Sequence, residues 1–176
     1  MAEKRNFVLK EKNEKEDGLN PKSEKARVNK GIELGESGNY YEAIECFDKV
    51  LEINPKNKEA WFNKGIALCE SDEYDEAIKC FDRVLEIDPK NEEAWDDKAT
   101  ALHILGKYNE AIKCFNKLLE INPKNEQVLV NKGNALCESG KYNEAIKCFD
   151  KVLETDPKNE QVLVDKAVAL GKLHWK

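Results

Sequence analysis

A repeat of 34 residues constrains this chain more than any other feature of its sequence. The decapeptide GKYNEAIKCF occurs at Gly106–Phe115 and again at Gly140–Phe149. The same spacing separates the members of four further sets: Pro55, Pro89, Pro123 and Pro157; Tyr40, Tyr74, Tyr108 and Tyr142; Ala43, Ala77, Ala111 and Ala145; Phe47, Phe81, Phe115 and Phe149. Self-similarity at this period indicates a stack of small supersecondary units, each in contact with its neighbours.

Each unit is predicted to consist of two helices joined by a turn. A first helix is expected at residues 59–71, where apolar residues recur at helical spacing. The turn residues Ser71-Asp72-Glu73 follow, and a second helix is expected from about Tyr74 to Ile87. Its apolar residues lie at i, i+3, i+4 and i+7: Ala77, Ile78, Phe81, Val84 and Leu85. Pro89 ends this helix, because the residue before a proline is disfavoured in helical geometry. No segment alternates apolar and polar residues as a strand does, so the predicted fold class is all-α.

One position of the first helix holds only small residues. Its occupants along the chain are Gly31, Gly65, Ala99, Gly133 and Ala167. We expect the two helices of a unit to approach closely at this position. The large phenylalanine of the second helix then fills the space that the small residue leaves.

Composition excludes several classes of protein. The formal net charge is −6 with 36% charged residues, whereas a general nucleic-acid binder needs a basic face. No apolar run approaches the roughly 20 residues of a membrane span. The first residues have only Phe7-Val8-Leu9 as an apolar segment, which does not suit a secretory signal. We therefore expect a cytoplasmic protein whose six cysteines stay reduced.

The pattern resembles that of the tetratricopeptide repeat family, in the style of its prokaryotic-type members. In the second unit the family's pattern falls on Trp61, Lys64, Gly65, Leu68, Ala77, Phe81, Val84 and Pro89. Lys64 stands where the family has leucine, and the same departure recurs at Lys30, Lys98, Lys132 and Lys166. The resemblance implies a right-handed α-solenoid of helix-turn-helix repeats.

The repeat pattern divides the chain into six parts. Residues 24–57, 58–91, 92–125 and 126–159 are predicted to form four repeats, residues 160–176 a C-terminal capping helix, and residues 1–23 a charged tail or degenerate half-repeat.

The resemblance also implies a concave face, lined by the first helices, that binds segments of partner proteins. The sixth position of each unit reads Asn29, Asn63, Asp97, Asn131 and Asp165. Asparagine offers both a donor and an acceptor, so such a row can pair with the main chain of an extended peptide. The row resembles the asparagine ladder in the repeat domain of O-linked N-acetylglucosamine transferase. The alternative is a row of solvated polar side chains.

The fifth and ninth positions of the units are unusually apolar for a groove. Their apolar occupants are Val28, Phe62, Val130 and Val164 at the fifth, and Ile32, Ile66 and Val168 at the ninth. An exposed apolar patch on a concave face suggests a protein partner. Two alternatives carry equal weight: coverage by Phe7-Val8-Leu9 of the N-terminal segment, and self-association.

Charge indicates the kind of segment that such a groove accepts. Glu93, Asp96 and Asp97 make an acidic spot that favours neutral or basic segments over acidic tails. Chaperone-binding members of the family carry a carboxylate clamp of Lys, Asn, Asn, Lys and Arg. The two frames of this chain read Val28, Ile32, Asn63, Glu93 and Asp97, or Phe62, Ile66, Asp97, Gln127 and Asn131. Binding of a chaperone's C-terminal carboxylate is therefore not expected.

The cysteines invite a metal hypothesis that geometry opposes. They recur in two rows: Cys46, Cys80, Cys114 and Cys148; then Cys69, His103 and Cys137. Equivalent residues of stacked units should lie about 10 Å apart, whereas zinc ligands lie roughly 2.0–2.3 Å from the metal. We therefore expect packing residues, no metal and no cofactor. No nucleophile–histidine–acid arrangement or phosphate loop is present, so an enzyme is not expected.

These observations predict a cytoplasmic scaffold for protein–protein interaction that binds a peptide segment of its partner. The expected binding residues are Asn29, Asn63, Asp97, Asn131 and Asp165 with Phe62, Ile66 and Val130. The alternative function is a structural module that self-associates through the terminal helix at residues 160–176. Neither nucleic acid nor membrane is an expected partner.

Overall fold

The structure is a computed structural model that describes residues 21–174, with side chains from Ser23 onward. The described residues form helices joined by short turns and contain no strand, which confirms the all-α fold class. The helices are α1 (Pro21–Glu36), α2 (Tyr40–Ile53), α3 (Lys58–Glu70), α4 (Tyr74–Ile87), α5 (Glu92–Ile104), α6 (Tyr108–Ile121), α7 (Glu126–Glu138), α8 (Tyr142–Thr155) and α9 (Glu160–His174). Within this described range no helix has both the length and the apolar character needed to cross a membrane.

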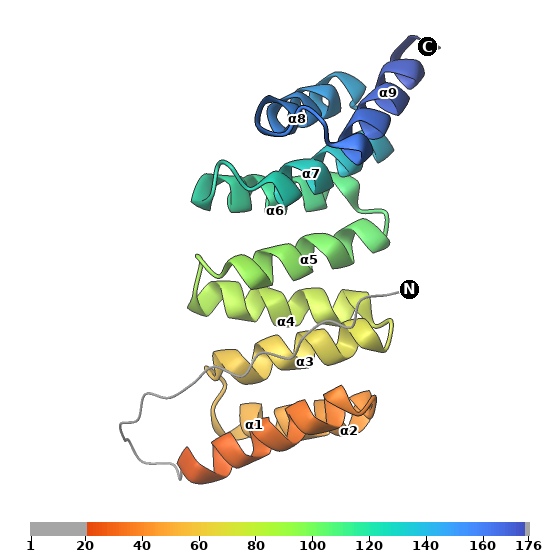
Figure 1. The fold of residues 1–176 in the computed structure, drawn as a ribbon. Helices are drawn as coiled ribbons and strands as arrows, with labels where there is room; N and C mark the ends of the chain where they lie inside the picture. The colour runs from red at the N-terminus through yellow and green to blue at the C-terminus, as the bar shows by residue number, and fades with distance from the viewer. Residues whose placement is uncertain (1–20, 175–176) are drawn as a thin grey trace. The chain divides into compact units, whose positions relative to one another are not determined.

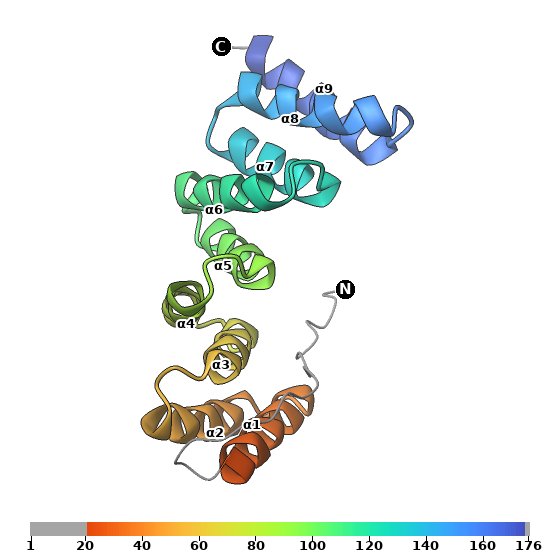
Figure 2. The same ribbon diagram turned by 90° about the vertical axis from the view of Figure 1, so that its left-hand side faces the viewer.

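The chain divides into two compact units, Met1–Ala94 and Trp95–Lys176, so the boundary falls inside α5. In the first unit α2 packs against α1 and α3, α3 packs against α4, and α1 also contacts α3. Figure 2 shows the consequence, because α1 and α3 lie on one side of this unit and α2 and α4 on the other. In the second unit α7 packs against α6 and α8, and α9 packs against α8 and contacts α7 (Figure 1). Four helices predicted as first helices thus lie in contact in pairs, α1 with α3 and α7 with α9.

The recurring proline loop positions each first helix. Oδ1 of Asn57 accepts a hydrogen bond from the backbone N–H of Ala60 at 2.9 Å, which caps the start of α3. Asn125 caps α7 in the same way, with 3.1 Å to the N–H of Val128. Because an N-cap side chain satisfies a backbone donor that the helix leaves unpaired, the asparagine at each repeat junction determines where the next helix begins.

The predicted close approach of paired helices is confirmed at the glycine position. A Cβ placed on Gly65 would lie 2.7 Å from Cε1 of Phe81, and one on Gly31 would lie 2.6 Å from the same atom of Phe47. Both rings are fully buried. The ring therefore occupies the volume that any larger side chain at the glycine would need.

The lysine that departs from the family's leucine has a charged partner on the preceding helix. Lys64 of α3 forms an ion pair with Asp48 of α2 and lies 5.8 Å from the ring centroid of Trp61. Lys166 of α9 pairs with Asp150 of α8 at 2.6 Å. Because the aliphatic stem of a lysine can pack while its ammonium meets a carboxylate, the substitution keeps part of leucine's packing role.

Asp72 is expected to cost stability, because it occupies a turn position where the other repeats have glycine. Its φ is +62°, in the left-handed region, and Gly38, Gly106 and Gly140 have φ values of +83°, +71° and +76°. We expect Asp72→Gly to raise the free energy of unfolding by up to about 1 kcal/mol, since the Cβ strain of this conformation, about 1–2 kcal/mol, disappears. The loss of the exposed hydrogen bond from the Tyr74 hydroxyl to Oδ1 of Asp72, at 2.8 Å, offsets part of this gain. Urea unfolding followed by circular dichroism measures the change. The converse variant Gly106→Asp should lose a similar amount, and a loss of stability in Asp72→Gly would contradict the assignment of strain.

Candidate functional site

The apolar residues expected to line an exposed groove are buried in the first unit. Phe62 is 7% exposed and Ile66 2%, and Val28 and Ile32 are also buried. Val28 and Ile32 belong to a core cluster with Phe47 and Val50 of α2, and the Phe62 ring lies 5.9 Å from that of Phe81. The expectation of exposure is therefore wrong for these four residues, because their positions pack against neighbouring helices. Val130 is half-buried, and only on α9 are the equivalent residues exposed, Val164 by 58% and Val168 by 50%.

The row at the sixth position is also uneven. Asn29, Asp97, Asn131 and Asp165 are half-buried, whereas Asn63 is completely buried. The alternative of a row of solvated polar side chains is therefore wrong at Asn63. That the row binds the main chain of a peptide stays a prediction.

In the second unit, the side-chain oxygen at the sixth position accepts a hydrogen bond from a glutamine four residues earlier. Nε2 of Gln127 donates to Oδ1 of Asn131 at 3.0 Å, and Nε2 of Gln161 donates to Oδ1 of Asp165 at the same distance. In α3 the residue at the glutamine's position is Glu59. An ionised carboxylate has no proton to donate, so it cannot repeat this hydrogen bond.

Asn63 consequently carries an unsatisfied acceptor. Its Nδ2 donates to the backbone oxygen of Glu59 at 2.8 Å, but its buried Oδ1 has no hydrogen-bond partner among the described residues. A buried acceptor left unpaired costs about 1–3 kcal/mol. A leucine would fill a similar volume without this cost, so folding alone does not account for asparagine here.

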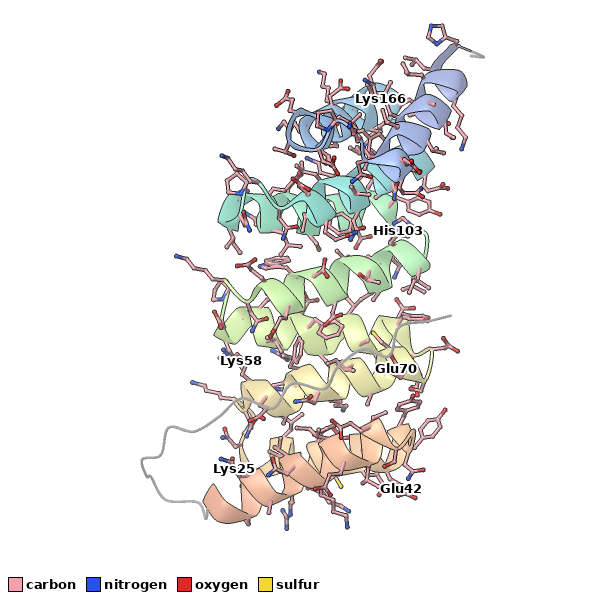
Figure 3. The ribbon with its side chains drawn as sticks, in the orientation of Figure 1. Lys25, Glu42, Lys58, Glu70, His103 and Lys166 are labelled. Carbon is pink, nitrogen blue, oxygen red and sulfur yellow. The ribbon has the colours of Figure 1, made fainter. Side chains whose placement is uncertain are left out.

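Asn63 lines a hollow in the first unit. The hollow has a volume of about 330 Å³ and is lined by Asn57, Lys58, Glu59, Phe62, Asn63, Asn91 and Glu93. It lies at the Lys58 end of α3, the end opposite Glu70 in Figure 3. Small-molecule and side-chain sites typically begin at about 300 Å³, so the space suffices for one side chain or a small ligand. We call this space the α3 hollow.

The α3 hollow is acidic. Nζ of Lys58 lies 2.6 Å from a carboxylate oxygen of Asp88, so the positive charge of this lysine is balanced. Glu59 and Glu93 add two carboxylates to the lining. The α3 hollow thus combines negative charge, one buried acceptor and the apolar Phe62, which suits a ligand that is both cationic and a hydrogen-bond donor.

A larger hollow on the other side of α3 has no such acceptor. Its volume is about 470 Å³, and its charged lining residues have partners within the first unit. Lys79 pairs with Glu76 and Arg83 with Glu86, each at 2.7 Å. Surface pairs of this kind contribute little energy and leave no unsatisfied group for a ligand, so this hollow is the weaker candidate.

Among the described residues no group of three or more histidine, cysteine, aspartate and glutamate side chains could hold a metal ion. Cys69, Cys80, Cys114 and Cys148 are buried, and Cys46 and Cys137 are half-buried. The ring of His103 lies 5.2 Å from that of Tyr108 in an edge-on contact. The cysteines therefore lie where packing residues are expected, and the absence of a metal stays a prediction.

The thiol of Cys80 is expected to be unreactive in the folded chain. Burial raises its pKa to about 12 from an ordinary value of 9.0. At pH 8 the thiolate fraction should therefore be about a thousandfold smaller than in unfolded chain. Alkylation by iodoacetamide at pH 8, followed by peptide mass spectrometry, should show slow modification of Cys80 in the folded chain. Only in urea should Cys80 react at the rate of an ordinary unfolded-chain thiol.

The same pKa shift makes folding stability depend on alkaline pH. The folded state keeps the Cys80 proton to a higher pH than the unfolded state, so this contribution to stability is intact below pH 9. It is lost as the pH rises from 9 through about 12. Rapid alkylation of Cys80 in the native state at pH 8 would contradict the buried environment.

Comparison with known proteins places the chain in a group of helical-repeat structures. Residues 36–101 and 102–169 match the family model described as "Tetratricopeptide repeat". A search of curated protein sequences gave no match. The solved structure "Crystal structure of MamA protein" superimposes with a TM-score of 0.81 at 18% identity, covering 88% of this chain and 84% of that one. "Crystal structure of YrrB: a TPR protein with an unusual peptide-binding site" gives a TM-score of 0.74 at 22% identity, with 84% and 76% covered. At these identities the similarity concerns the fold.

Proposed function

Because the chain belongs to the tetratricopeptide repeat family, whose repeats serve as scaffolds for protein–protein interaction, we propose that it binds an extended segment of a partner protein. The proposed binding surface is the first-helix face, which we define for each unit by itself as the helix faces that carry the sixth-position residues. In the first unit these are the faces of α1 and α3, and in the second unit those of α7 and α9. A cytoplasmic location stays a prediction.

The observation that carries this proposal is the buried, unpaired Oδ1 of Asn63, a residue that lines the α3 hollow. An acceptor that the fold leaves unsatisfied is complete when a ligand donates to it. A YrrB structure, similar in fold, is described as having an unusual peptide-binding site, which supports peptide binding as a use of this architecture. The α3 hollow offers hydrogen-bond and charge contacts, so binding is the chemistry that we propose for it.

Panning a random peptide display library on the full chain tests the proposal. We expect enriched peptides whose titration shifts backbone amide NMR signals of the first-helix face. The variant Asn63→Ala/Asn131→Ala should weaken such peptides at least about tenfold. Its matched control is Lys113→Ala/Lys147→Ala, which alters exposed equivalent positions of α6 and α8 and should bind normally. Failure to enrich any peptide, or shifts confined to α2, α4, α6 and α8, would contradict the proposal.

A second function, self-association, is supported by a separate observation on α9. Leu163, Val164, Val168 and Leu170 are all exposed on this helix. Apolar side chains gathered on one helix favour contact with another apolar surface, and a second copy of this chain offers the same surface. Light scattering over a range of concentrations should then show a dimer that Val164→Glu/Val168→Glu converts to monomer, and a monomer at all concentrations would contradict this function.

A further inference from the structure

We propose that the α3 hollow receives the side chain of an arginine in the partner's segment. This inference rests on the proposed function and specifies the ligand at one site. It starts from three properties of the hollow that the structure shows together: an unpaired buried acceptor, an acidic lining and an aromatic ring.

The acceptor determines which kind of group can bind. Oδ1 of Asn63 needs an N–H or O–H donor, because a carbonyl oxygen cannot donate. Peptide N–H groups, hydroxyl groups and cationic side chains all meet this first requirement. Asn63 alone therefore does not distinguish them.

The charge of the lining narrows the choice to cations. The charged residues that line the α3 hollow are Glu59, Glu93 and Lys58, so carboxylates outnumber the ammonium, which pairs with Asp88. A neutral donor entering this acidic space gains one hydrogen bond, whereas a cation gains charge complementarity as well. An acidic segment is repelled.

The geometry of the cation favours arginine over lysine. A guanidinium carries five N–H donors in one plane, so a single group can donate to Asn63 and to a carboxylate together. Its plane also stacks on aromatic rings and is less strongly hydrated than an ammonium. Phe62 lines the hollow beside Asn63 and supplies an apolar aromatic edge to it, although only 7% of this residue is exposed.

The difference between the repeats explains why this site forms in α3 and not in α7. Gln127 already donates to Asn131 in α7, so that acceptor is satisfied by the chain itself. Glu59 at the equivalent position of α3 supplies a negative charge in place of a donor. One residue thus changes both the charge and the hydrogen bonding of the site.

Titration of the full chain with three capped tripeptides tests the proposal. The central residue is arginine, lysine or citrulline, which keeps the shape of arginine but has no charge. The readout is the NMR signal of the Asn63 side-chain amide and of the backbone amides of residues 58–63. We expect the arginine peptide to bind at least about tenfold more tightly than the citrulline peptide, and more tightly than the lysine peptide.

Two substitutions at neighbouring residues serve as matched variants. Glu59→Gln supplies the donor found in α7 and removes one charge, so it should weaken the arginine peptide at least about tenfold. Asn63→Leu removes the acceptor and should have the same effect. Both variants should fold, with melting temperatures equal to or above that of the unaltered chain, because Asn63→Leu removes the unsatisfied buried acceptor and Glu59→Gln supplies it with a donor. The control Gln127→Glu alters α7 and should leave binding in the α3 hollow unchanged.

The outcomes separate this inference from the proposed function. Equal affinity for the arginine and citrulline peptides would overturn the arginine assignment and leave segment binding standing. Display-selected peptides that shift the NMR signals of the first-helix face but not those of residues 58–63 would also overturn the arginine assignment and leave segment binding standing. Arginine binding that becomes tighter in the full-length variant Arg5→Gln would assign the α3 hollow to the chain's own N-terminal segment and overturn the role of a partner. The absence of binding by any peptide, selected or synthetic, would remove both proposals.

Discussion

Phe81→Ala is expected to lower the free energy of unfolding of the first unit by about 3–5 kcal/mol. The ring is fully buried between α3 and α4, where a Cβ on Gly65 would lie 2.7 Å from it and the ring of Phe62 lies 5.9 Å away. Alanine removes these contacts and leaves a cavity opposite a glycine, whose lack of a side chain prevents compensation from α3. Urea unfolding followed by circular dichroism measures the loss.

Two further substitutions make this result specific to the cavity. Phe81→Leu retains most of the volume and should lose clearly less stability than Phe81→Ala. Tyr41→Ala removes an aromatic ring from α2, the second helix of its repeat. Because Tyr41 is 69% exposed, the free energy of unfolding should change by no more than about 0.5 kcal/mol. A loss below about 1.5 kcal/mol in Phe81→Ala would contradict the packing described here.

Gly65→Leu is expected to destabilise the same contact from the opposite helix, by about 2–3 kcal/mol or more. Leucine favours helix by about 0.8 kcal/mol relative to glycine, but its side chain must enter the space of Phe81. Because that ring is fully buried, it cannot move aside without displacing other core residues. The free energy of unfolding in urea again measures the effect.

Gly171→Leu is the matched control, because it changes a helical glycine with open space around it. Apart from its chain neighbours and the backbone of its own helix, no heavy atom of the described residues lies within 4 Å of a Cβ built there, so helix propensity should dominate and stability should rise slightly. The double variant Gly65→Leu/Phe81→Ala completes a mutant cycle. Its loss should be smaller than the sum of the single losses, since the leucine occupies the vacated space. Strict additivity would show that the two positions do not share one volume.

Much of the fold could be predicted from the repeat period and the helical spacing of apolar residues. The second helix expected from about Tyr74 to Ile87 has those bounds as α4, and the first helix expected at residues 59–71 differs by one residue at each end from α3. Prolines, turn residues and small residues act locally, so their positions in sequence carry this information. The four equal repeats drawn at residues 24–159 stay predictions, and most of residues 1–23 lies outside the described part of the chain.

The site could be predicted only in part. Asn63 and Phe62 were correctly placed on one helix, but their burial depends on how α3 packs against its neighbours, which the repeat pattern does not encode. Equivalent positions also differ in exposure between helices, as Ile66 is buried and Val168 exposed. The unsatisfied acceptor does have a sequence signal, because Glu59 stands where two later repeats have glutamine. Recognising it requires knowing that the glutamine donates to the residue four positions later.

The lysines at the family's leucine position could be recognised from the sequence, but their ion-pair partners could not. Lys64 and Lys166 were identified as a systematic departure from the family pattern, but their carboxylate partners lie on the preceding helix, 16 residues earlier. Asp48 and Asp150 occupy equivalent positions of α2 and α8, so the ion pair is itself part of the repeat. The sequence signal of this ion pair is therefore an aspartate and a lysine that recur together, 16 residues apart.

The central claim is that the first-helix face binds an extended segment of a partner, with the α3 hollow as one of its contact points. Intermolecular nuclear Overhauser effects between a display-selected peptide and the full chain test this claim most directly. We expect contacts from peptide protons to the Phe62 ring and to the Asn63 side-chain amide. Contacts restricted to α2 and α4, with the signals of Phe62 and Asn63 unchanged at saturation, would contradict it.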